Sequence, residues 1–130
     1  MYKSESKKES EDQNMDNHEL KKYINIEEGL GRLLGNKTLF KRILTIFSAS
    51  DAMDRLEKDF NEGNLQKASE VAHEIKGMAG NLSLTALYTD SADLMVTLRT
   101  GICEADRVAE CRRIWNITED VVKQVLVDFQ

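Results

Sequence analysis

The chain of 130 residues contains no proline, only 6% aromatic residues and only two cysteines. Aromatic and β-branched residues dominate strands, so this composition, with 32% charged residues, favours helices over sheets. Cys103 and Cys111 are too few for a disulfide framework or a zinc knuckle. The sequence therefore predicts a fold that is held together by packing between helices.

Basic residues are not in excess, and no long apolar run is present. The net charge of −5 argues against a protein that binds nucleic acid or a membrane surface. No run of 18 apolar residues could span a bilayer, and the N-terminus lacks the apolar segment of a signal peptide. We expect a soluble, reduced, cytoplasmic protein.

Residues 1–23 are strongly polar and charged. They hold too little apolar surface to offset the entropy of ordering, so we expect a disordered tail or linker there. His18 lies in this segment without nearby partner ligands and is interpreted as a solvated histidine. Residues 24–130 are expected to form a single domain.

Helical periodicity recurs throughout that domain. Apolar residues spaced three and four apart predict a short helix at 27–34 and long helices at 37–61 and 65–82, then one to about residue 100 and one from 104 or 105 to the end. Ser83 or Thr85 is expected to cap the fourth of these helices. Cys111 falls on an apolar stripe and is predicted to be a small core residue. We therefore predict an all-α fold, an antiparallel up-down four-helix bundle with a short additional N-terminal helix.

One stretch of the predicted 65–82 helix contains the candidate functional residues. His73, Lys76, Gly77 and Gly80 stand at i, i+3, i+4 and i+7, which places them on one helical face. The core stripe of the same helix lies elsewhere, so the imidazole should point outward with a cation one turn away. Two glycines in mid-helix cost about 1 kcal/mol each relative to alanine, which is hard to explain by stability alone.

The motif His73-x-x-Lys76-Gly77, followed by Gly80-Asn81-Leu82, resembles the signature of histidine-containing phosphotransfer (HPt) domains. The resemblance extends from about residue 26 to the C-terminus. It implies a four-helix bundle that relays phosphoryl groups, with Nε2 of His73 as the phosphorylated atom. Ser83 stands where the family often has glycine, and this departure concerns the turn that follows the helix.

The site residues then receive expected roles. His73 would accept and donate the phosphoryl group, Lys76 would stabilise its charge, and Gly77 would leave room for the partner. Gly80, Ser69 and Gln66 are expected to contact the partner or the ring. Neighbouring Glu74 is interpreted as a solvated residue, and Asn81 as a structural residue at the helix end.

The resemblance also implies the partners. The chain shows no glycine-rich ATP loop, Walker motif or kinase signature, so we expect a phosphotransfer protein without an ATP site, not an ATP-using enzyme. Receiver domains of a hybrid sensor kinase or a response regulator would supply and accept the phosphoryl group. We expect no cofactor or metal in this chain, because Mg²⁺ would belong to the receiver, and we expect a monomer.

Two alternatives stay open. The chain could be a helical docking module of the same fold that binds without chemistry, or the C-terminal HPt domain of a hybrid kinase. A zinc or haem bundle is disfavoured, because His73 has no second inward-facing ligand.

Overall fold

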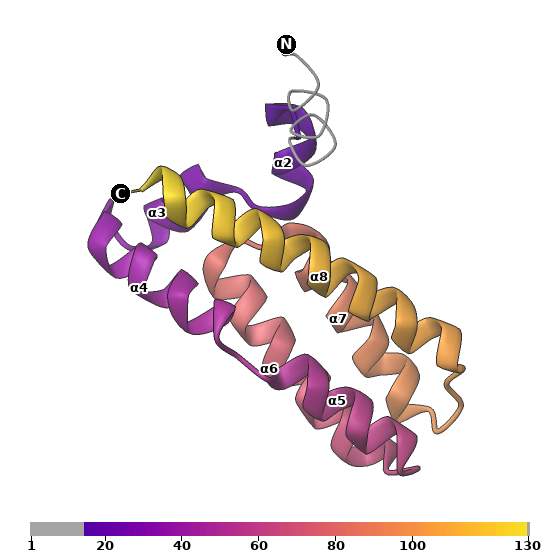
Figure 1. Cartoon of the computed structure of the whole chain (residues 1–130). Coiled ribbons are helices and arrows are strands. Elements are labelled where there is room, and N and C mark those ends of the chain that lie inside the picture. Colours follow the sequence, from indigo (N-terminus) through magenta and orange to yellow (C-terminus); the bar gives the residue numbers. More distant parts are fainter. Residues whose placement is uncertain (1–14, 130) are drawn as a thin grey trace.

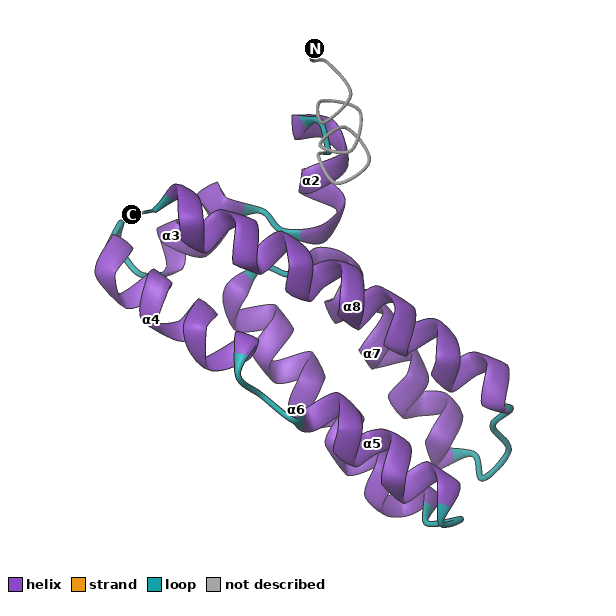
Figure 2. Cartoon of the chain, viewed as in Figure 1, coloured by secondary structure: helices purple, strands orange, loops and turns teal. Residues whose placement is uncertain are grey.

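A computed structural model describes residues 15–129, and every regular element in this range is a helix (Figure 2). The elements are α2 (Asn17–Tyr23), α3 (Ile26–Arg32), α4 (Lys37–Ser48), α5 (Ala52–Asn61), α6 (Leu65–Leu82), α7 (Thr85–Arg99) and α8 (Ala105–Asp128). The all-α class is confirmed. The predicted 65–82 helix is confirmed residue for residue, and the last helix begins at Ala105 as expected.

The long helices lie side by side along a common axis (Figure 1). α7 packs between α6 and α8, α5 packs mainly on α6, and α4 contacts both α6 and α8. Only Ser83 and Leu84 separate α6 from α7, so the chain reverses direction there. α3 lies at one end of this bundle, whereas α2 projects from its side and contacts α7 and α8 (Figure 1).

The predicted continuous helix over residues 37–61 is wrong, because the chain breaks between Ser48 and Ala52. α4 ends at Ser48 with Ala49 as its C-cap, and the Ser50 hydroxyl then accepts a hydrogen bond from the Ala52 backbone N–H at 3.1 Å. A serine side chain that bonds the backbone in this way competes with the helical pattern. α4 and α5 together therefore occupy the place of one long helix.

The expected disordered tail is wrong over Asn17–Tyr23, which form α2. The Asp16 carboxylate caps this helix by accepting from the Glu19 N–H at 2.8 Å. Its last turn is tied to α7, because the Thr85 hydroxyl donates to the Lys22 carbonyl at 2.6 Å. Residues 1–14 lie outside the described residues, so for them the expectation of disorder stays a prediction.

The turn between α6 and α7 differs from the expectation that Ser83 or Thr85 caps α7. Leu84 occupies the cap position and makes no side-chain cap bond. Ser83 instead ends α6 in the left-handed region, with φ of 57°. Its hydroxyl accepts from Arg32 and donates to Glu28 at 2.7 Å, which links α3 to the end of α6 and holds the pKa of the Glu28 carboxyl below its usual value.

α3 approaches its neighbours closely at Gly29. A Cβ at this position would lie 2.7 Å from the Phe40 ring and 3.2 Å from the Leu82 carbonyl oxygen. Glycine therefore permits α3 to cross against α4 and the end of α6.

The core confirms the apolar stripe of α6. Ala68, Ala72, Ile75, Ala79 and Leu82 are all buried, and Leu65 is half-buried. Phe47 and Trp115 pack with ring centroids 4.8 Å apart, and Cys111 is fully buried, as predicted. No helix formed by residues 15–129 combines the length and the apolarity needed to cross a lipid bilayer.

Candidate functional site

α6 presents the candidate site because its two ends and its core stripe fix its rotation. The Asn64 side chain caps the helix by accepting from the Lys67 N–H at 3.1 Å, and Ser83 ends it. Ala72 and Ile75 are turned into the core, which leaves His73 between them on the exposed side.

The His73 imidazole is exposed and has no side-chain partner among residues 15–129, either by hydrogen bond or by ion pair. Lys76 is half-buried and likewise makes no ion pair within that range. In a helix, residues three apart are surface neighbours, so the ammonium group can reach the space around the imidazole. Within the part of the chain that the structure describes, the pair therefore combines an exposed imidazole and an ammonium group that no other side chain binds.

The two glycines of the stripe have different surroundings. A Cβ at Gly77 would meet nothing within 4 Å, so no contact among the described residues requires glycine there. A Cβ at Gly80 would lie 3.2 Å and 3.3 Å from ring carbons of Tyr88. Gly80 therefore allows the Tyr88 ring to pack on α6, whereas Gly77 lies at an open position one turn from His73.

The structure separates the two residues that precede His73. Ser69 is 1% exposed, and its hydroxyl donates to the Gln66 carbonyl at 2.7 Å, so the expectation that Ser69 contacts a partner is wrong. Ser69 is buried because it lies beside the core residue Ala68, which the spacing from His73 alone did not reveal. Gln66 is exposed, with its amide donating to Glu70 at 3.3 Å, and its role toward a partner stays a prediction.

Glu74 is more than the solvated residue expected from the sequence. Arg55 of α5 reaches across and donates to both carboxylate oxygens, at 2.6 Å and 3.2 Å. Arg55 also donates from Nε to Asp51 at 2.8 Å, and this bond holds the pKa of the Asp51 carboxyl below its usual value. The motif gave no signal for Arg55, because its sequence distance from His73 says nothing about how α5 packs on α6.

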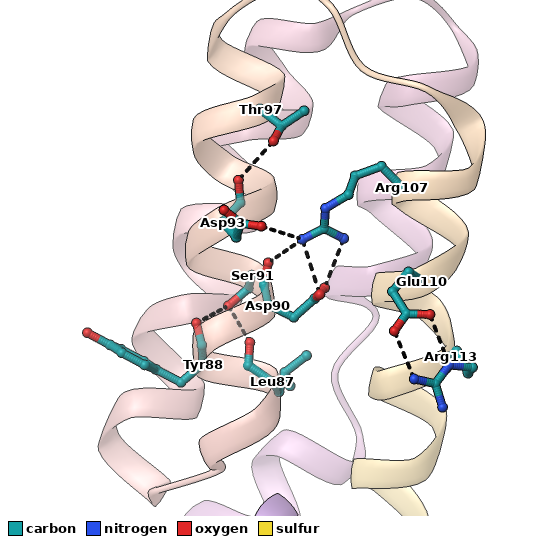
Figure 3. Close-up of polar contacts among 9 residues, drawn as sticks. All are labelled: Leu87, Tyr88, Asp90, Ser91, Asp93, Thr97, Arg107, Glu110 and Arg113. Atoms are coloured by element: carbon teal, nitrogen blue, oxygen red, sulfur yellow. Dashed lines mark hydrogen bonds and ion pairs between the residues drawn. The ribbon is translucent and has the colours of Figure 1, made fainter.

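A second polar cluster joins α7 to α8 (Figure 3). Arg107 contacts Asp90 at 3.1 Å and Asp93 at 3.6 Å, and also donates to the Asp90 carbonyl at 2.9 Å. Asp90 and Arg107 are largely buried, so this cluster ties α7, which packs on α6, to α8. Across residues 15–129, no three His, Cys, Asp or Glu side chains are grouped to hold a metal ion.

Comparison with known protein families gives one match. Residues 44–112 match the family model described as Hpt domain, which covers more than half of the chain and includes all of α5, α6 and α7. No match was found among curated proteins or among solved structures. The matched segment contains His73, Lys76, Gly77 and the Arg55–Glu74 pair.

Proposed function

The chain belongs to the Hpt domain family, whose members transfer phosphoryl groups in two-component signalling, and from this premise we propose that His73 is its phosphoryl carrier. His73 takes the group from the phosphoaspartate of one receiver domain and passes it to the aspartate of another. The exchange is reversible, and the protein acts as a monomeric intermediate.

The observation that carries this proposal is the exposed imidazole of His73, which has no partner in residues 15–129 and lies beside the open position at Gly77. A phosphoryl acceptor must align with the phosphorus atom and the leaving oxygen, so access decides the reaction more than activation does. An acyl phosphate is already a reactive donor. A core or metal-binding histidine would instead be buried or paired.

The chemical step forms one bond and breaks one. A neutral ring nitrogen, Nε2 by analogy with the family, attacks the phosphorus of the phosphoaspartate with its lone pair. The phosphorus–oxygen bond to the aspartyl carboxyl group breaks, and its electron pair leaves on the carboxylate. Transfer to the second receiver reverses these events, so no water or nucleotide is consumed.

Both proteins stabilise the negative charge of the transferred phosphoryl group. Lys76, half-buried and unpaired among the described residues, pairs with the phosphoryl oxygens from the Hpt side. Mg²⁺ bound by the receiver acts from the other side, so this chain needs no metal of its own. The docking surface comprises the exposed face of α6 around His73 together with the adjoining surface of α5.

A transfer assay tests the proposal. A phosphorylated receiver domain with Mg²⁺ is mixed with the protein, and the appearance of an acid-labile, base-stable adduct on this chain is followed. We expect the adduct to form with the native chain and to be absent from His73→Gln, while the helical circular dichroism spectrum of the variant is unchanged because His73 is exposed.

Receivers that bind but transfer nothing would contradict the proposal and favour the docking module. A labelled His73→Gln variant would place the acceptor elsewhere. Separate receivers, taken from hybrid kinases and from response regulators, distinguish the donor from the acceptor.

A further inference from the structure

A groove of mixed charge runs beside α6, the helix that carries His73. The groove between α5 and α6 is lined by charged residues of both signs, namely Arg55, Lys58, Asp59, Lys67, Glu70 and Glu74. Glu74 directly follows His73 in the chain. The phosphoryl group and its phosphoaspartyl donor are negative, so an uncompensated carboxylate at this place would oppose their approach.

Arg55 is placed to neutralise the Glu74 carboxylate. Its Nη2 and Nη1 atoms contact Oε2 and Oε1 of Glu74 at 2.6 Å and 3.2 Å, which is a two-pronged bond of the kind that only a guanidinium makes. The third contact, from Nε to Asp51 at 2.8 Å, anchors the side chain on α5. Glu74 is thus held toward α5 and neutralised in place.

We propose that Arg55 is a positioning residue for phosphotransfer, which screens Glu74 so that a negative receiver can approach His73. This inference rests on the function proposed above and assigns part of it to α5. Arg55 makes no contact with the reacting atoms and acts through Glu74. Glu70 also lines the groove and accepts from the neutral amide of Gln66 at 3.3 Å, whereas Glu74 is the carboxylate that Arg55 pairs.

A purely structural role explains the pair less well. Arg55 and Glu74 side chains are 42% and 45% exposed, and ion pairs with such exposure contribute little to folding. Long-range charge, in contrast, changes the rate at which charged proteins associate and does so most at low salt. The two roles therefore predict different results for the same variant.

The experiment measures phosphotransfer from one receiver at low and high salt, for the native chain and for a set of full-length variants. For Arg55→Gln we expect kcat/KM to fall about three- to tenfold at low salt, mainly through KM, because one charge near the reacting phosphoryl group is left uncompensated. High salt should reduce the difference. Arg55→Lys keeps the charge and should retain most of the rate.

The double variant, in which the transfer rate should be restored, is the decisive part of the experiment. In the double variant Arg55→Gln/Glu74→Gln, both charges are gone, and we expect kcat/KM to return to within about twofold of the native value. Glu74→Gln alone should transfer at least as fast as the native chain. A matched control is Arg113→Gln on α8, which loses the same charge from a similarly exposed pair with Glu110 at 2.8 Å and should leave transfer unchanged.

Three outcomes would overturn the inference. Native rates in Arg55→Gln would show that Glu74 needs no screening. A double variant as slow as the single one would show a structural role, as would an equal loss at low and high salt. An equal loss of kcat/KM in Arg113→Gln would show that the net charge of the chain, and not the position of Arg55, determines the rate of transfer. Failure of the native chain itself to transfer would contradict the proposed function, and so the two failures are distinguishable.

Discussion

Replacing Gly77 by alanine is expected to make the protein more stable, although the residue lies in its candidate site. Gly77 is in the interior of α6, where glycine is about 1 kcal/mol less favourable than alanine. The added methyl group would meet nothing within 4 Å, so no packing cost offsets this gain. For the roughly 115 residues described, about 1 kcal/mol corresponds to a rise of about 4 °C in Tm.

A large side chain at the same position should impair phosphotransfer. A leucine at residue 77 would project from the face that carries His73, one turn further along α6. We expect Gly77→Leu to keep or raise the stability, since leucine is also a good helix former, and to lower the transfer rate by roughly tenfold or more because misalignment of the reacting groups is costly.

Thermal unfolding followed by circular dichroism, together with the receiver transfer assay, measures both effects. Gly31→Leu is the matched control, because Gly31 also faces open space but lies on α3. It should leave the transfer rate unchanged. A lower Tm in Gly77→Ala, or unchanged transfer in Gly77→Leu, would refute the reasoning that glycine is present for the partner and not for the fold.

Three further predictions follow from single contacts. Lys76→Ala should slow transfer and alter the lifetime of the phosphohistidine while the Tm stays constant; a native rate would contradict its role toward the phosphoryl oxygens. Gly29→Ala should lower the free energy of unfolding by about 1–3 kcal/mol in denaturant titrations, because its Cβ would lie 2.7 Å from the fully buried Phe40 ring. Burial raises the pKa of the Cys111 thiol, so the folded state keeps it neutral at a pH where the unfolded thiol ionises. The stability that this thiol contributes is complete below about pH 8.5 and falls by up to about 1.4 kcal/mol per pH unit above it, and Cys111→Ala should lack that component of the slope between about pH 8 and pH 10.

The sequence predicted the elements whose periodicity is strong. The alternating apolar positions of α6 placed both of its ends, and His73 is exposed as the stripe required. The start of α8 at Ala105 was likewise predicted from the spacing of its apolar residues. Local spacing suffices in these cases because a helix is a local structure.

The sequence did not predict the features that depend on contacts with a neighbouring helix. The break near Ser50 coincides with a bond from the Ala52 backbone N–H to the Ser50 hydroxyl, and the Ser83 hydroxyl bonds Glu28 of α3 at the end of α6. The burial of Ser69 and the reach of Arg55 to Glu74 depend on how neighbouring helices pack on α6, which one helix does not encode. α2 was missed because its few apolar residues are stabilised only by contact with the rest of the bundle.

The most direct test of the central claim is to locate the phosphoryl group after transfer from a phosphorylated receiver. Mass spectrometry of the chain, under conditions that preserve phosphoramidates, should find a single modification, on His73, that disappears when a second unphosphorylated receiver is added. A modification on any other residue, or a group on His73 that no receiver can remove, would contradict the account of this protein as a phosphoryl carrier between receivers.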